Sequence, residues 1–243
     1  MPTERLYYKD PYLRTFEATV LSVEALEGEK SAVTLDATAF YPEGGGQPAD
    51  TGKIRGKDGT LIVEWTEDRG GEIVHIGKID GVISVGERVT GEIDWDRRYL
   101  IMRTHTAAHI LMHAVSRLLE HVDIAGSGLS VGSGRLDFAA SITRDQLPAI
   151  EEEANKIVEM DAEVRVHVFS REEAARLLES YGSHLGPAHG GLSEIRVIEI
   201  VGVGADACGG THVARTSEVG RIRITKRKSK GRGVVRLEFQ VTD

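Results

Sequence analysis

The chain has 243 residues, enough for one large domain or two modest ones, and 40% of them are hydrophobic, which favours a packed core over disorder. Its net charge of −8 argues against indiscriminate binding to nucleic acid, so any such contact has to come from a local basic patch. A single cysteine excludes disulfides within the chain. With no signal peptide and no membrane-spanning apolar run in view, we expect a cytoplasmic protein without a membrane partner.

The first part of the chain is rich in predicted strands. Short alternating segments are separated by turn-forming residues at 26–29, 56–59 and 68–71. This spacing predicts a small β-barrel or β-sandwich domain over residues 1–92. The predicted strands cover residues 16–23, 31–36, 59–65 and 73–76.

From about Asp96 the apolar period changes to that of a helix. Apolar residues recur at helical spacing between Tyr99 and Leu119, and this longest predicted helix carries His105 and His109. We place the domain boundary near residues 89–93, so that the second domain covers residues 93–243.

The second domain mixes helices and strands. Thr143 with Gln146 and Ser170 with Glu173 each resemble a capping box that opens a helix. We therefore predict an α+β fold with an antiparallel sheet backed by helices. The predicted strands cover residues 132–139, 163–169, 195–201, 221–225 and 234–241, with a turn over 226–233.

Two pairs of metal-capable side chains stand about a hundred residues apart. His105 and His109 are four residues apart on the predicted helix and therefore share one face. Cys208 and His212 are also four residues apart, in a glycine-rich loop that lets the backbone turn tightly. One sulfur and three imidazoles suit Zn²⁺ best, so we predict one shared zinc site and, with it, a hydrolase.

The donor set alone leaves the kind of site open. Structural zinc sites have four protein ligands, whereas catalytic sites keep one position free. Thr106 stands where a zincin has its glutamate, which argues against a metalloprotease of that type.

A run of three glycines, Gly44, Gly45 and Gly46, is followed by Gln47. One interpretation is a flexible hairpin loop. The other is a loop beside the metal pocket that offers backbone amides to a small polar substrate. The run does not end in the Lys-Ser/Thr pair of a P-loop.

Basic residues cluster near the end of this acidic chain. The cluster is the natural place for a phosphate backbone to dock, and the alternative is a solvated turn on exposed strands. We favour RNA binding through Lys226, Arg227, Lys228, Lys230 and Arg232, which Arg221, Arg223 and Arg236 flank.

Together these strings resemble the AlaX family of alanyl-tRNA editing proteins, which is related to the editing domain of alanyl-tRNA synthetase. The N-terminal β domain with its glycine-rich motif resembles the medium-length AlaX-M type. The resemblance spans most of the chain, and its matching strings are residues 40–52, 95–99, 102–111, 134–138 and 208–212.

The resemblance implies a hydrolase that deacylates tRNA(Ala) mischarged with serine, and with glycine as a second candidate. It implies Zn²⁺ held by His105, His109, Cys208 and His212, with residues 44–47 next to the pocket. At Ile124 the sequence departs from the glutamine expected in the synthetase domain, which leaves the recognition of serine in doubt. No protein partner is evident.

Zinc can activate a bound water or position the substrate, and the sequence does not choose between these roles. Thr38, Thr106 and Gln47 are the candidates for contact with the hydroxyl of serine. An RNA-binding module with a structural zinc is the alternative function. A zinc amidase or esterase of small molecules is a third.

Overall fold

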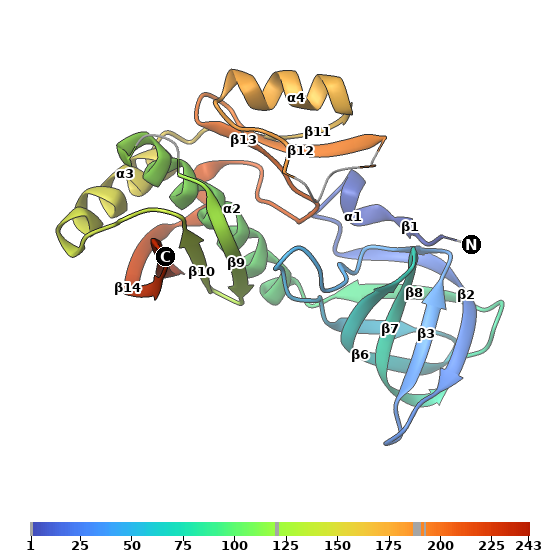
Figure 1. The fold of residues 1–243 in the computed structure, drawn as a ribbon. Helices are drawn as coiled ribbons and strands as arrows, with labels where there is room; N and C mark the ends of the chain where they lie inside the picture. The colour runs from blue at the N-terminus through green and yellow to red at the C-terminus, as the bar shows by residue number, and fades with distance from the viewer. Residues whose placement is uncertain (1, 120–121, 187–190, 192) are drawn as a thin grey trace. The chain divides into compact units, whose positions relative to one another are not determined.

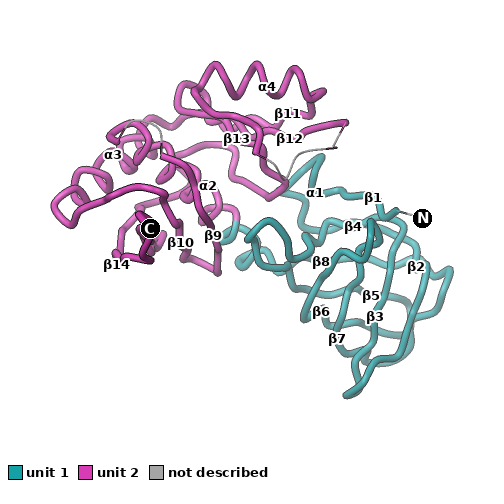
Figure 2. The backbone as a smooth tube through the Cα atoms, viewed as in Figure 1, with its two compact units in different colours: residues 1–101 teal, residues 102–243 magenta. Residues whose placement is uncertain are grey.

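The computed structural model describes residues 2–119, 122–186, 191 and 193–243. They fall into two compact units, residues 1–101 and 102–243 (Figure 2). The division lies within helix α2 (Trp95–Leu119), whereas the sequence placed it near residue 92, at the end of strand β8. The roles assigned to the two predicted domains stay predictions.

A closed antiparallel barrel forms most of the first unit (Figure 1). Its strands alternate between apolar residues that point into the barrel, such as Val33, Leu35 and Leu61, and polar residues that point outward. The strands follow one another in the order β2 (Thr15–Ala25), β3 (Ser31–Leu35), β7 (Glu72–Val82), β6 (Asp58–Arg69), β5 (Gly52–Arg55) and β8 (Arg88–Ile93).

A short parallel pair accompanies the barrel. Strand β1 (Glu4–Arg5) pairs with β4 (Ala37–Thr38), and helix α1 (Leu6–Lys9) follows β1 directly. The barrel confirms the sequence prediction for this part of the chain, although β5 and β8 are barrel strands that the sequence analysis missed.

Two antiparallel sheets and their helices form the second unit, which confirms the α+β prediction. Helix α4 (Arg171–Ser180) covers one of the sheets (Figure 1), with Ala174 and Leu178 packed against Val197 and Ala205. That sheet has the order β11 (Val164–Ser170), β12 (Glu194–Ile200), β13 (Gly204–Ala207).

The other sheet contains the chain's last hairpin. Helix α3 (Leu147–Glu159) packs near its edge, where Asn155 accepts from the amide of Ile222 at 3.0 Å. The strand order is β14 (Arg221–Gly231), β15 (Val234–Thr242), β10 (Ser133–Phe138), β9 (Ile124–Ser130).

Both predicted capping boxes are present. Thr143 and Gln146 frame a 3₁₀ helix, Arg144–Gln146, that leads into α3, and Ser170 accepts from the amide of Glu173 at the start of α4. Another 3₁₀ helix, Thr216–Val219, precedes β14. Within the described part of the chain, no helix is long and apolar enough to cross a membrane.

Candidate metal centre

Helix α2 places the first histidine pair. Residues Ala107, Ile110, Leu111 and Ala114 are fully buried and fix one side of the helix in the core of the second unit. His105 and His109 lie one turn apart, with ring centroids separated by 5.2 Å, and both residues are buried.

Strand β13 and the loop after it place the second pair. The amide of Cys208 donates to the carbonyl of Arg196 on β12 at 3.0 Å, so the strand pairing extends to the cysteine. The Arg196 guanidinium donates from Nη1 to the carbonyls of Cys208 at 2.7 Å and Gly210 at 2.8 Å. A half-buried cation therefore holds the loop in the turn that brings His212 back toward Cys208.

All four predicted ligands converge. One donor atom from each of His105, His109, Cys208 and His212 can be chosen so that all lie within 4.8 Å of one another. Cys208 Sγ lies 3.5 Å from His105 Nε2 and 3.4 Å from His212 Nε2. The sequence had joined these residues from positions about a hundred apart.

The distances fit a tetrahedral ion. Zinc–sulfur bonds near 2.3 Å and zinc–nitrogen bonds near 2.0–2.1 Å put sulfur and nitrogen about 3.5 Å apart in a tetrahedron. Both sulfur–nitrogen distances at Cys208 match this value. A thiolate with imidazoles is a donor set that zinc favours, so these residues fit a zinc ion.

The electrostatics favour the ligand forms of two donors. Burial alone would raise the pKa of the Cys208 thiol, but its charge interactions with His105 and His212 lower it well below its usual value. Burial, together with the charge of His105, lowers the pKa of His212 to about 3. Both shifts favour the forms that bind a metal, which are the thiolate of Cys208 and the neutral ring of His212.

His109 behaves differently. Burial lowers its pKa, but hydrogen bonds to Asp206 and Cys208 outweigh burial and raise the pKa to about 10. Metal binding at His109 therefore displaces a proton, which weakens binding in acid.

Thr106 lies behind the metal donors. Its side chain is fully buried, and Oγ1 lies 3.1 Å from His212 Nδ1 and accepts from the amide of Val213 at 3.3 Å. This hydroxyl contacts the ring of His212 on the side away from Nε2, so it orients a predicted ligand. Its contact with a substrate stays a prediction.

Thr38 lies in the barrel unit and is also fully buried. His75 Nδ1 donates to the carbonyl of Val33 at 3.0 Å, so Nε2 is an acceptor, and the Thr38 hydroxyl donates to it at 2.8 Å. The same hydroxyl accepts from the amide of Phe40 at 3.1 Å. Its bonding capacity is thus largely used inside the barrel unit.

The three glycines form a tight hairpin turn. Gly44 and Gln47 exchange both backbone hydrogen bonds, at 3.1 and 2.9 Å, across Gly45 and Gly46. Those two central residues have φ of 60° and 82°, the left-handed values that this turn needs and that glycine adopts freely. Gln47 is fully buried, and Tyr41 donates to the Gly44 carbonyl at 3.2 Å.

The basic cluster is part of a strand. The sequence predicted a turn over 226–233, and this was wrong for Lys226–Lys230, because β14 continues to Gly231 in register with β15. The turn itself is confined to the end of the hairpin, where Arg232 and Gly233 have φ of 51° and 78°. Strand pairing overrides the weak strand preference of consecutive Lys and Arg residues.

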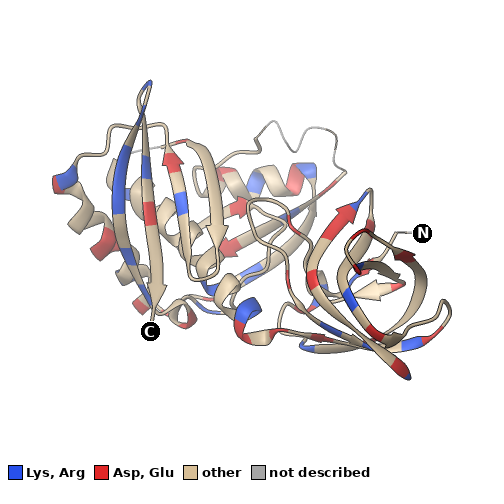
Figure 3. Ribbon diagram, turned by 90° about the horizontal axis from the view of Figure 1, so that it is seen from below, with Lys and Arg blue, Asp and Glu red and all other residues tan. Residues whose placement is uncertain are grey.

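Basic residues recur along this edge strand (Figure 3), and most of their side chains are exposed. Lys226, Lys228, Lys230 and Arg232 are exposed, and Lys228 pairs with Glu238 at 3.4 Å. Arg227 is different, because it is half-buried and donates to the carbonyl of Ile142 at 2.8 Å. Four of the five predicted RNA contacts therefore face solvent.

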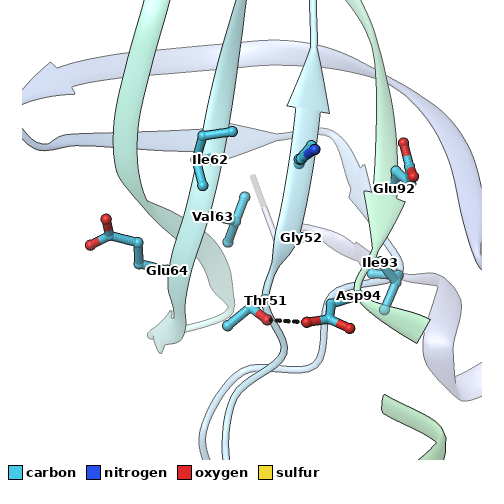
Figure 4. Close-up of a pocket in the computed structure, with 9 residues that line it drawn as sticks. Thr51, Gly52, Ile62, Val63, Glu64, Glu92, Ile93 and Asp94 are labelled. Atoms are coloured by element: carbon cyan, nitrogen blue, oxygen red, sulfur yellow. Dashed lines mark hydrogen bonds between the residues drawn. The ribbon is translucent and has the colours of Figure 1, made fainter. Parts of the chain in front are cut away.

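A pocket of about 570 Å³ lies on the outside of the barrel (Figure 4). Thr51 donates to Asp94 at its rim at 3.3 Å, and its carboxylates Glu64 and Glu92 pair with Lys30 and Arg55. None of the residues predicted to bind substrate lines it.

Two residues at the metal centre were missed by sequence reasoning. Asp206 accepts from His109 Nδ1 at 2.8 Å, and Arg196 holds the Cys208 loop. Their sequence signals were weak: Asp206 stands two residues before the only cysteine, and Arg196 lies in the predicted strand before it. Ile124, where the resemblance leads us to expect glutamine, begins β9 and is half-buried.

Comparison with known proteins agrees with this arrangement. Residues 2–97 match the family "tRNA synthetases class II (A)", and residues 195–238 match "Threonyl and Alanyl tRNA synthetase second additional domain". The alanyl-tRNA editing protein AlaX-M of Methanosarcina acetivorans is 38% identical, over 99% of this chain and 100% of its own. The chain belongs to the AlaX family.

Longer proteins also contain an AlaX-like region. The alanyl-tRNA editing protein AlaX-L of Pyrococcus horikoshii is 38% identical over 97% of this chain and 57% of its own. The alanine–tRNA ligase of Ignicoccus hospitalis is 40% identical over 98% of this chain, which spans 26% of that ligase. The resemblance drawn from the sequence is thereby confirmed at the level of the family.

Proposed function

We propose that this AlaX protein is a trans-editing hydrolase that deacylates mischarged tRNA(Ala), chiefly the seryl ester and secondarily the glycyl ester. The observation that carries the proposal is the convergence of one thiol and three imidazoles within 4.8 Å in a chain of the AlaX family. Relatives that align with this chain over their full length carry the name alanyl-tRNA editing protein.

His105, His109, Cys208 and His212 would hold Zn²⁺, which supplies Lewis acidity when bound. The chain's own groups prepare that site. Thr106 fixes the ring of His212, Asp206 fixes that of His109, and Arg196 fixes the loop that carries Cys208. Preorganised donors of this kind need no rearrangement when an ester is bound.

The environment of the donors controls access of water. The three histidines are between 3% and 8% exposed, whereas Cys208 is only partly buried. A substrate ester would therefore approach from the Cys208 side, and the apolar core beneath the histidines excludes water from the other side. An aminoacyl ester is labile, so positioning of the ester and a water supplies much of the rate.

For recognition of the tRNA we propose the exposed side chains of Lys226, Lys228, Lys230 and Arg232 on β14 and its turn. For the substrate amino acid, residues 44–47, Thr38 and Thr106 remain the proposed contacts. Burial makes a positioning role the better supported one for the two threonines.

A second function is favoured by the same four donors. Four protein ligands are the pattern of a structural zinc, so an RNA-binding module without turnover also accounts for the site. The two functions differ in what chelation does. A structural ion unfolds its domain on removal, whereas removal of a catalytic ion abolishes hydrolysis and leaves most of the fold.

The test is a deacylation assay with seryl-, glycyl- and alanyl-tRNA(Ala), with and without a chelator. We expect seryl-tRNA(Ala) to be hydrolysed fastest, and Cys208→Ala to abolish this rate. His167→Asn is the matched control, because His167 is a partly buried histidine that pairs with Glu199 and is not among the four donors. Equal seryl rates for Cys208→Ala and the wild type would contradict the proposal.

A further inference from the structure

The metal donors belong to a longer series of residues on helix α2 and strand β13 that face each other. His105, His109 and His113 follow one another at intervals of four residues on one face of α2. Asp206 and Cys208 lie on one face of β13 and its extension. Ala205 and Ala207 lie on the other face and pack toward α4. Four helical residues rise about 6 Å and two strand residues about 6.6 Å. Every fourth residue of α2 can therefore face every second residue of β13.

The contacts follow this register. Cys208 Sγ lies 3.5 Å from His105 Nε2. One step further, Asp206 Oδ2 lies 2.8 Å from His109 Nδ1 and 2.8 Å from His113 Nε2. The side chains of these three residues are between 9% and 18% exposed.

The distances separate two kinds of cluster. Nitrogen and carboxylate ligands on one tetrahedral zinc would lie about 3.4 Å apart, from bond lengths near 2.0–2.2 Å. The two contacts of Asp206 are 2.8 Å, the length of a charge-assisted hydrogen bond. Asp206, His109 and His113 therefore form a hydrogen-bonded group and not a second metal site.

At the end of this series, His113 packs against Gly204. A Cβ built on Gly204 would lie 2.2–2.4 Å from atoms of the His113 ring, so the imidazole packs directly on the bare backbone of β13. Any larger residue at this position would push His113 away from Asp206. The packing thus fixes the imidazole that holds the carboxylate.

From this geometry we infer that Asp206 and His113 act together as positioning residues for the metal ligand His109. The carboxylate of Asp206 can only accept, so His109 Nδ1 carries the proton and Nε2 is left as the ligand atom. His113 donates to the same oxygen from the next turn and stops the carboxylate from rotating. The inference rests on the metal site of the proposed function, but it makes no use of tRNA.

The test is metal affinity, measured for Zn²⁺ by competition with a chromophoric chelator. Asp206→Asn keeps the side-chain volume but replaces one acceptor oxygen with a donor. His113→Phe keeps a ring against Gly204 and removes the donated hydrogen bond. Glu199→Gln is the matched control, because Glu199 on the neighbouring strand accepts from His167 at the same 2.8 Å without contacting a metal donor.

We expect Asp206→Asn to bind Zn²⁺ 10–100-fold more weakly, the usual effect of removing an outer partner of a ligand histidine. His113→Phe should bind several-fold more weakly, and Glu199→Gln should match the wild type. The absorption bands of bound Co²⁺ should shift in the first two variants only, since the ligand ring is reoriented.

Wild-type affinity in Asp206→Asn, or an equal loss in Glu199→Gln, would overturn the inference. If Asp206→Asn does not fold, unchanged affinity in His113→Phe overturns it instead. A wild-type protein that takes up neither Zn²⁺ nor Co²⁺ would overturn the proposed metal site along with the inference. Loss of deacylation with unchanged affinities would leave the metal site standing and contradict the positioning role.

Discussion

Arg98 and Asp50 form an ion pair whose two side chains are 0% and 1% exposed. Arg98 Nε donates to both carboxylate oxygens, at 2.9 and 2.8 Å, and Nη1 donates to the carbonyl of Pro11 at 3.0 Å. Asp50 also accepts from the amide of Tyr41, at 2.6 Å. The pair thus joins two of the strings that resemble the AlaX family, residues 40–52 and 95–99, and clamps the base of the glycine turn.

Removal of the arginine should destabilise the barrel unit strongly. Arg98→Met leaves the carboxylate of Asp50 buried without a cation, which costs about 3–5 kcal/mol. Both tryptophans, Trp65 and Trp95, lie in residues 1–101, so their fluorescence during urea unfolding reports on this unit.

The control is Arg55→Met, which breaks the exposed pair with Glu92 in the same unit. A pair of this kind contributes about 0–1 kcal/mol, so the unfolding midpoint should barely move. Similar midpoints for the two variants would show that the buried pair is not what holds the motif.

The stability of the barrel unit should fall in mild acid because of His75. Burial lowers the pKa of this histidine to about 4, below its ordinary value of 6.5. Between these values the unfolded chain takes up a proton that the folded barrel does not, so stability present above pH 6.5 is lost as the pH falls toward 4. The full loss corresponds to roughly 3 kcal/mol.

The measurement is tryptophan fluorescence during urea unfolding from pH 7 to pH 4.5, with chelator present throughout so that metal loss does not contribute. His75→Gln should be less stable at pH 7 but should lose less stability on acidification. A variant that loses as much as the wild type would assign the acid sensitivity to other groups.

The hydroxyl of Thr106 should act on metal binding through the ring of His212. Thr106→Val removes the hydroxyl that contacts His212 Nδ1, so we expect weaker Zn²⁺ binding by about tenfold. Thr106→Ser keeps the hydroxyl and should bind Zn²⁺ as the wild type does. Competition with a chromophoric chelator measures the affinities.

A substrate role for Thr106 gives the opposite result. In that case Thr106→Val would keep its Zn²⁺ affinity and lose its preference for seryl- over alanyl-tRNA(Ala). The ratio of the two deacylation rates, measured at saturating Zn²⁺, distinguishes the two roles.

The sequence predicted the convergence of His105, His109, Cys208 and His212, because local rules place each pair. A spacing of four puts His105 and His109 on one face of a helix, and the only thiol marks the other pair. Asp206 was not predictable in the same way, because its role depends on the register between β13 and α2, which are far apart in the chain. Local patterns do not encode that register.

The fold shows the same division. The sequence predicted most of β6 and the start of β7, whereas β5 and β13, with four residues each, are too short to give a periodic signal. The longer strands β8 and β9 were also missed. Lys226–Lys230 were predicted as a turn because Lys and Arg are poor strand formers. Their state is decided by pairing with β15, whose apolar residues Val235, Leu237 and Phe239 face the core.

The exposed lysines of β14 should determine the salt dependence of tRNA binding. Each phosphate contact contributes about 0.9 to the slope of log affinity against log salt on a duplex. Lys226→Gln and Lys230→Gln should therefore each lower the slope by up to about one and weaken binding at low salt. Lys57→Gln, at an exposed lysine on the barrel, should leave the slope unchanged if β14 is the contact surface.

Arg227 distinguishes a residue that stabilises the fold from one that binds RNA through its charge. The guanidinium of Arg227 donates to the carbonyl of Ile142. Arg227→Gln should therefore lower the unfolding temperature and leave the salt slope of tRNA binding nearly unchanged. The measurement is tRNA binding by fluorescence anisotropy between 50 and 200 mM salt, on the order of the range where such slopes are resolved. Equal slopes for Lys226→Gln, Lys230→Gln and Lys57→Gln would remove β14 from the RNA interface.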